Sequence, residues 1–196
     1  MDRSPPMPRI AAEHHGPIVG LDGETACSEH GAVCAIGVAV VHLGRVADEA
    51  HWLVDPETRF DPRFIGIHGI TPDMVRGRPP LRTIWRELLA FVDGAVAGSV
   101  DPPLIAGAVP AVDPLFVAHN AQFDKRQVEA AIGAALPFRL SCTVAMSRRA
   151  FPRLARHNLA TVAAHLNIPL RHHDALSDAR ACALIAHHAI KVGKPG

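Results

Sequence analysis

Two acids that follow a short apolar run near the N-terminus are the residues best placed for chemistry in this sequence. The run IVGL at 18–21 leads directly into Asp22 and Glu24. Alternate residues of a strand project from one face, so both carboxylates would point to the same place at the end of a buried element. Two anions held together repel each other and lose hydration. The pattern therefore predicts that a cation balances them.

Two further acids and a histidine occur in comparable settings. Asp124 follows the segment VAHNAQF at the start of an expected helix, and Asp178 lies on the last helix, five residues after His173. Carboxylates are the ligands that Mg²⁺ and Mn²⁺ prefer. Two such ions, roughly 3.5–4 Å apart, support hydrolysis of a phosphodiester. An imidazole accepts a proton from water near neutral pH. Each residue alone has an ordinary structural role, but together they favour a metal-dependent phosphodiesterase site.

Length and composition agree with one medium-sized domain that has a real core. The 196 residues carry a net charge of +1 and are 48% hydrophobic, which excludes a disordered chain. The four cysteines form no C-x-x-C pair, so neither a zinc site nor a disulfide scaffold is expected. We find no run of signal-peptide or membrane-spanning character and expect a cytoplasmic protein.

The order of the expected elements is that of an α/β layer with a mixed sheet. A leader over 1–16 precedes a single domain over 17–192, within which 93–114 is expected to be an irregular Gly-, Pro- and Ala-rich loop. A hairpin turn is expected near Leu43-Gly44-Arg45, and a helix start at Thr71-Pro72. Strands are expected in the segments 17–22, 32–44, 45–56, 114–119 and 138–144. Helices are expected in the segments 81–92, 121–136, 157–168 and 175–190.

Three segments, LDGET, VAHNAQFD and HHDALSDA, resemble the exonuclease motifs of the DEDDh family of 3′–5′ exonucleases, in the same order. This family includes the proofreading (epsilon) subunit of bacterial replicative DNA polymerase, ribonuclease T and oligoribonuclease. IHGITPDMV at 67–75 and HNLATVAAHLNI at 157–168 also resemble family segments, so the likeness covers about 17–190. It implies a ribonuclease-H-like fold, with a five-stranded mixed β-sheet flanked by α-helices.

The resemblance also implies roles for individual residues. The metal ligands for two divalent ions, Mg²⁺ or Mn²⁺, would be Asp22, Glu24, Asp124 and Asp178. His173 matches the general base, whereas its neighbour His172 is one residue out of register.

Substrate contacts are implied less directly. Backbone N–H groups at Gly23 and Thr25 would bind the terminal nucleotide, and Ile67 and His68 would contact its sugar or base unless their turn only packs on the core. Asn120 would contact substrate, orient the second motif or cap its helix. The arginines at 148, 149, 153 and 156 are candidates for following a phosphate backbone.

We therefore expect a 3′–5′ exonuclease that releases nucleoside monophosphates from single-stranded DNA. An RNA-trimming exoribonuclease is the alternative, and an inactive nucleic-acid-binding module is a third reading that the complete acid set disfavours. Two positions depart from the family pattern: Gly23 stands where Thr is common, and Ser141-Cys142 replace an Asp-Thr pair. The sequence ends soon after its last expected helix, without the long tail through which the proofreading subunit meets its polymerase. A polymerase partner and a homodimer are both left open.

Overall fold

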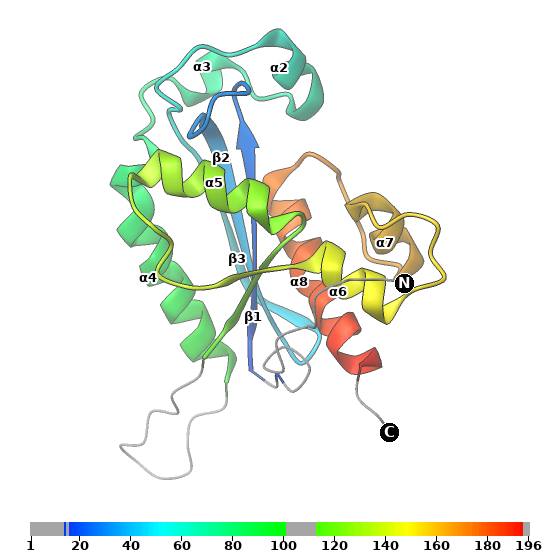
Figure 1. Ribbon diagram of the computed structural model, residues 1–196. Helices are drawn as coiled ribbons and strands as arrows, with labels where there is room; N and C mark the ends of the chain where they lie inside the picture. The colour runs from blue at the N-terminus through cyan, green and yellow to red at the C-terminus, as the bar shows by residue number, and fades with distance from the viewer. Residues whose placement is uncertain (1–13, 15, 101–112, 194–196) are drawn as a thin grey trace, which may run out of the picture.

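A mixed sheet of five strands lies at the centre of the structure, a computed structural model that describes residues 14, 16–100 and 113–193 (Figure 1). The strands run in the order β3-β2-β1-β4-β5. β1 pairs antiparallel with β2 and parallel with β4, which is the mixed pattern expected from the sequence. The strands are β1 Ile18–Thr25, β2 Val33–His42, β3 Arg45–Leu53, β4 Leu115–Ala118 and β5 Leu140–Cys142.

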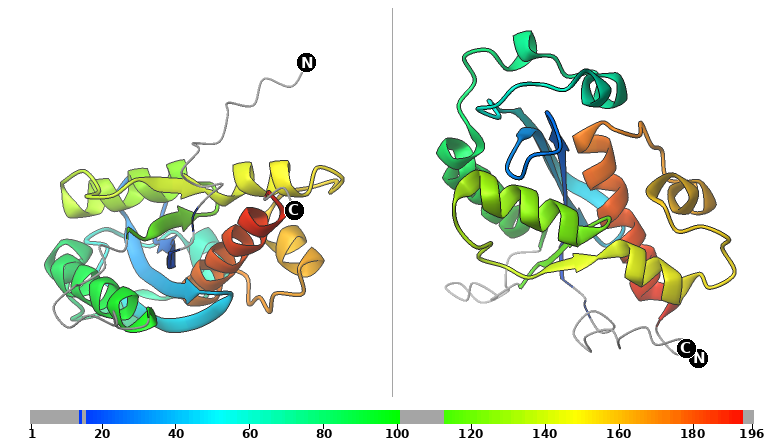
Figure 2. Two further views of the ribbon diagram at one scale, coloured as in Figure 1. Left: turned by 90° about the horizontal axis from the view of Figure 1, so that it is seen from below. Right: turned by 45° about the horizontal axis from the view of Figure 1, so that its top comes forward.

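Helices cover both faces of this sheet, as Figure 2 shows from two further directions. They are α2 Pro62–His68, α3 Pro72–Val75, α4 Leu81–Ser99, α5 Ala121–Ile132, α6 Thr143–Ala150, α7 Leu159–His165 and α8 Ala175–Val192. The alternation of side chains along β1 explains the two layers. Val19 and Leu21 pack into a core with α4, whereas Ile18 packs into a second core with α6, α7 and α8. The predicted fold class is confirmed.

The hairpin turn predicted near Leu43-Gly44-Arg45 joins β2 to β3, and its two turn residues are Leu43 and Gly44. Both residues have positive φ, 51° and 78° respectively, which is the backbone conformation of a type I′ turn. Asn158 caps α7 as expected, because its side chain accepts a hydrogen bond from the Thr161 N–H.

The helix expected to end at Val92 continues to Ser99, so the prediction of an irregular loop from residue 93 was wrong for its first part. Gly94 and Gly98 lower helix propensity, but Ala95 and Val96 are buried in the core against the sheet, and this packing outweighs propensity. Residues 101–112 of the expected loop, and the expected leader apart from 14 and 16, lie outside the described residues.

Two short helices were not predicted. α2 has clear signals in the sequence: Asp61 caps it by accepting from the Arg63 N–H, Pro62 is its first residue, and Gly69 ends it with φ 75°. α6 begins at Thr143, where the sequence suggested a continuing strand. Here Met146 is buried among residues of α7 and α8, and this tertiary contact stabilises a helix in place of an extended segment.

Across residues 16–100 and 113–193, none of the helices combines the length and apolar character needed to cross a bilayer.

Candidate active site

The last helix crosses the sheet in close contact with it, because two glycines face the helix. A Cβ added to Gly20 of β1 would lie 2.0 Å from the Ala179 carbonyl oxygen, and one added to Gly37 of β2 would lie 2.2 Å from that of Ala175. Gly37 pairs directly with Asp22. The absence of side chains at these positions therefore lets the first turn of α8, which carries Asp178, lie beside the end of β1.

Three of the predicted ligands converge at this crossing. Asp22, Glu24 and Asp178 each offer a carboxylate oxygen, and these atoms all lie within 4.8 Å of one another. Among the described residues, Oδ1 of Asp178 is the buried side-chain oxygen that has no hydrogen-bond partner. A cluster of hard oxygen donors with an unpartnered oxygen fits a divalent cation such as Mg²⁺ or Mn²⁺.

Asp124 approaches the same carboxylates from the first turn of α5, whereas Asp178 approaches them from α8. The pairing of β1 with β4 ends at Gly20, so the edge of β1 beyond that point is open to the first turn of α5. The backbone N–H groups of Asp124 itself and of Gly23 act against the effect of burial and lower the pKa of the Asp124 carboxyl, so the turn at Gly23 lies next to this carboxylate.

The electrostatics of the site show that the four acids form one group. Burial raises the pKa of Asp22 well above its ordinary value, and the charges of Asp124, Asp178 and Glu24 raise it further. Burial, followed by the charges of Asp178 and Asp124, raises the pKa of Glu24 to about 7. Burial likewise raises the pKa of Asp124 to about 7. Without a cation these carboxylates resist ionisation, so the site is built for bound positive charge.

Two adjacent histidines flank Asp178. The Nδ1 atom of His172 lies 2.9 Å from Asp178 Oδ2, and the backbone N–H of His173 donates to the same oxygen at 3.0 Å. The two imidazole rings stack, with centroids 3.9 Å apart. Burial and then the charge of His172 lower the pKa of His173, which keeps its exposed ring neutral and able to accept a proton.

His173 and Asn120 share an unusual backbone conformation. Both have positive φ, 68° and 65°, in the left-handed region that non-glycine residues seldom occupy. Asn120 makes no side-chain capping bond to α5, and its side chain is exposed. Asn120 therefore occupies the N-cap position of α5, as one alternative expected, but its side chain does not make the capping bond and its amide is exposed.

The C-terminal end of α2, with Ile67 and His68, lies next to His173 and borders the site on another side. The Ile70 N–H donates to Nδ1 of His68, which leaves Nε2 as the protonated nitrogen that donates to the Thr25 carbonyl at 3.1 Å. Burial, and in part the charge of His173, lowers the pKa of His68, so the two rings are neighbours. Ile67 is 52% exposed beside them. Thr25 itself is buried, and its carbonyl is occupied by His68.

A partly buried histidine, His119, links β4 to the segments around α6 and α7. His119 donates from Nε2 to the His157 carbonyl and accepts at Nδ1 from the Thr143 hydroxyl, both at 2.9 Å. Burial is the main cause that lowers its pKa to about 4, and the charge of His172 contributes. His119 therefore fixes the segment before α7 next to the site.

Four contributors were not found by sequence reasoning. His172 was set aside in favour of its neighbour, Gly20 was not singled out, and no sequence pattern marks Gly37 or His119 as part of the site. The G-x-D spacing of Gly20 and Asp22 is a usable signal, since residues two apart on a strand share a face.

Comparison with known proteins agrees with this geometry. The exonuclease family model (RNase_T) matches residues 19–186, so the chain belongs to the exonuclease family. The predicted membership of an exonuclease family is confirmed, and the fold is shared with solved exonuclease structures.

The sequence identity between this chain and individual relatives is low. The DNA polymerase III PolC-type protein of Clostridium perfringens is 28% identical over 84% of this chain, which spans only 10% of that protein's length. Exodeoxyribonuclease 10 of Escherichia coli is 29% identical over 81% of this chain and 61% of its own. Exonuclease X, solved in complex with 5′ overhanging duplex DNA, superposes with a TM-score of 0.63 at 23% identity, covering 89% of this chain and 90% of that one.

Proposed function

We propose that the protein removes nucleoside monophosphates from the 3′ end of single-stranded DNA, with two divalent metal ions and His173 as the general base. The observation that carries the proposal is the convergence of Asp22, Glu24, Asp124 and Asp178, from a strand and two helices, beside an exposed neutral histidine.

Asp22, Glu24 and Asp178 would hold the ions, with Asp124 completing the negative charge. Bound there, divalent cations supply Lewis-acid polarisation of the phosphate and a lowered pKa for the attacking water. Mg²⁺ and Mn²⁺ both suit a set made only of carboxylates. The elevated pKa values of Glu24 and Asp124 support this assignment, because a cation would favour their ionised forms.

His173 would take the proton of the attacking water. Its pKa lies below the ordinary histidine value, so the free base predominates at pH 7. The 3.0 Å bond from its backbone N–H to Asp178 fixes the residue next to the carboxylates while its ring stays exposed.

The 3′-terminal nucleotide would lie between α2 and Asn120. The exposed Ile67 offers an apolar contact for its sugar or base, and the unused Asn120 amide offers hydrogen bonds. His68 would shape this pocket through its bond to the Thr25 carbonyl rather than bind directly. DNA is favoured as substrate because Exodeoxyribonuclease 10 is named for deoxyribonucleic acid and Exonuclease X was solved with it.

The test uses 15-nucleotide DNA and RNA strands labelled at either the 3′ or the 5′ end, incubated with Mg²⁺, Mn²⁺ or EDTA. We expect mononucleotides from the 3′ end of DNA, only with a metal, and none from Asp22→Ala. Asp55→Ala is the control, because this carboxylate is outside the site. Internal fragments, or full activity of Asp22→Ala, would refute the proposal. Faster RNA degradation would replace DNA by RNA as substrate.

A further inference from the structure

The part of the chain that packs beside α8 carries a strongly one-sided charge. No Asp or Glu occurs from Ala130 to His173, although the whole chain has 19 acidic and 20 basic residues. This stretch comprises β5, α6, α7 and the connections between them, and we call it the basic lobe. Its basic residues are Arg139, Arg148, Arg149, Arg153, Arg156 and Arg171.

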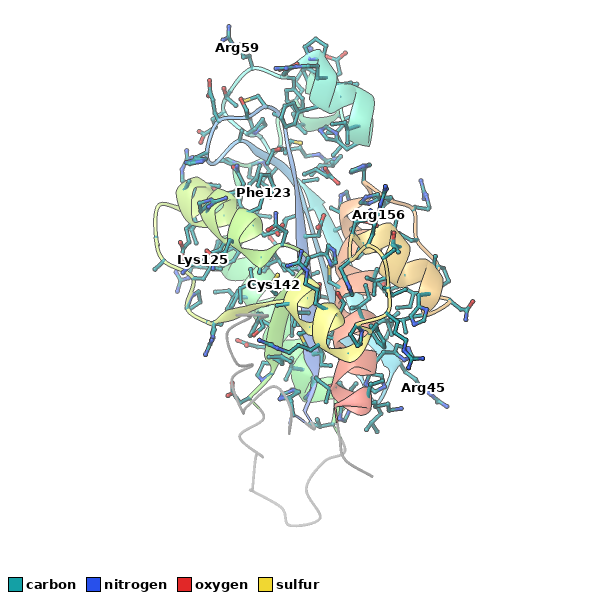
Figure 3. The ribbon with its side chains drawn as sticks, turned by 45° about the vertical axis from the view of Figure 1, so that its right-hand side comes forward. Arg45, Arg59, Phe123, Lys125, Cys142 and Arg156 are labelled. Carbon is teal, nitrogen blue, oxygen red and sulfur yellow. The ribbon has the colours of Figure 1, made fainter. Side chains whose placement is uncertain are left out.

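Arginines on the opposite side of the site lie among acids, and three of them form ion pairs, whereas the basic lobe itself contains no acid. Near α2, α3 and α4, Arg63 pairs with Asp61, Arg76 with Asp73 and Arg82 with Glu57. Within the described part of the basic lobe, the exposed side chains of Arg148, Arg153 and Arg156 form no ion pair. Figure 3 shows Arg156 on the side of the molecule that carries α6 and α7. Uncompensated positive charge therefore lies on one flank of the acids.

The basic lobe is continuous with the site. Arg171 directly precedes His172, which is bonded to Asp178. Arg156 directly precedes His157, whose carbonyl accepts the hydrogen bond from His119. His119 in turn precedes Asn120 at the rim. A polyanion that has one phosphate at the four acids would thus meet cations on this flank first.

A shallow hollow of about 410 Å³ lies on the same lobe, between the end of α6 and the end of α7. It is mostly apolar, and its lining residues are Ala150, Phe151, Pro152, Arg153, Leu154 and His165. Apolar and aromatic surface next to exposed arginine suits a nucleobase whose neighbouring phosphates contact the guanidinium groups.

We infer that the basic lobe binds the single strand upstream of its 3′ end, so that Arg153 and Arg156 contact backbone phosphates and the adjoining hollow accepts a base. This rests on the proposed function for its substrate class. The inference also gives the DNA strand a direction: from the four acids it runs over α6 and α7 and not over α2. An acidic protein segment is the competing occupant that the same charge would attract.

The first experiment measures binding without cleavage. Fluorescein-labelled dT15 is titrated in EDTA and followed by fluorescence anisotropy at 50 and 200 mM salt. We expect Arg153→Gln/Arg156→Gln to bind dT15 about tenfold more weakly than the wild type. The slope of log K against log[salt] should also be shallower by about 1.4, because each lost phosphate contact on a single strand reduces this slope by about 0.7. Arg45→Gln/Arg86→Gln removes two exposed charges elsewhere and should stay within about twofold of the wild type.

Equal affinity of these two double variants for dT15 would overturn the inference. It would also be overturned if an acidic 15-residue peptide containing phenylalanine lost affinity for Arg153→Gln/Arg156→Gln while dT15 did not. Arg148→Gln/Arg156→Gln keeps Arg153 and so removes one of the two assigned contacts. It should weaken dT15 binding by a smaller factor and make the slope of log K against log[salt] shallower by about 0.7, which guards against a local folding defect in the first pair.

The second experiment separates this inference from the proposed function. Thymidine 5′-(4-nitrophenyl phosphate) has a scissile phosphate but no upstream strand. With Mn²⁺, Arg153→Gln/Arg156→Gln should hydrolyse it with the kcat/KM of the wild type. A lower kcat/KM would show that the arginines act on the metal site and would overturn the inference. Failure of the wild type to hydrolyse it would count against the proposed function, while the binding comparison with dT15 would still stand.

Discussion

The Nδ1 atom of His172 lies 2.9 Å from Oδ2 of Asp178, and this contact holds one of the two oxygens of the carboxylate in place. Oδ2 is held by His172 and by the His173 N–H, whereas Oδ1 is buried and has no partner. Asp178 is therefore oriented before any cation binds. Partners of this kind tune the affinity of metal ligands.

We predict that His172→Ala weakens Mn²⁺ binding about 10–100-fold, because Asp178 loses one of the two hydrogen bonds that orient it. The measurement is isothermal titration calorimetry with Mn²⁺. His172→Asn, which keeps a donor near the position of Nδ1, should restore most of the affinity. Wild-type Mn²⁺ affinity in His172→Ala would show that the bond to Asp178 does not orient the ligand.

The neighbouring histidine should behave differently. We expect His173→Asn to lower kcat by roughly 10²–10⁴ while Mn²⁺ affinity stays near that of the wild type, because the base is lost and the backbone N–H to Asp178 is kept. Asn is preferred over Ala since it tolerates the positive φ of 68°. The check is single-turnover kinetics across pH 5–9. A retained wild-type rate, or lost Mn²⁺ affinity, contradicts the assigned role.

The crossing of α8 over the sheet gives a structural prediction. Gly37→Ala should destabilise the protein and disrupt the site, because the new Cβ would lie 2.2 Å from the Ala175 carbonyl oxygen and must displace the first turn of α8. Thermal unfolding and Mn²⁺ titration measure both effects.

Gly23→Ala is the matched control for Gly37→Ala. A Cβ at Gly23 meets its nearest atom at 3.7 Å, an ordinary contact. This variant should keep wild-type stability and Mn²⁺ affinity, which also explains why Gly is compatible with a position that is often Thr in similar proteins. Equal losses in both glycine variants would rule out the steric explanation.

The raised carboxyl pKa values predict how stability depends on pH. The pKa of Glu24 rises from 4.5 to about 7, and that of Asp124 from 3.8 to about 7. In the folded, metal-free protein each of these two carboxyls therefore binds more protons than in the unfolded chain between about pH 4 and 7, and the stability it contributes falls as the pH rises through this range. Histidines with a lowered pKa, such as His119, act in the opposite direction, so the test compares the wild type with a variant that lacks one of the carboxyls.

Divalent ions should reverse this trend, because they stabilise the ionised carboxylates. The gain in Tm from Mn²⁺ is expected to be larger at pH 8 than at pH 5, where protons compete for the same oxygens. In EDTA, raising the pH from 5 to 8 should lower the Tm of the wild type relative to that of Glu24→Gln, because only the wild type carries the raised Glu24 pKa. The same change of Tm with pH in both proteins would mean that the acids are not forced together as the structure indicates.

Local sequence patterns determined the identity of the acids, the positions of the regular strands and the longer helices, and the hairpin at Leu43-Gly44. Each of these depends on neighbours in the chain: alternation along a strand, capping residues at a helix end, or the φ preferences of a turn. The capping signals of α2, at Asp61, Pro62 and Gly69, were equally local and were present to be found.

The tertiary structure alone decided how the acids come together. Gly20 and Gly37 are far from Ala175 and Ala179 in sequence, and only the folded contact shows that α8 needs two missing side chains to bring Asp178 to Asp22. The extension of α4 to Ser99 and the choice between helix and strand at Thr143 also depended on burial against distant elements. Packing between segments far apart in the chain leaves no local pattern, because its free energy comes from surfaces that meet only after folding.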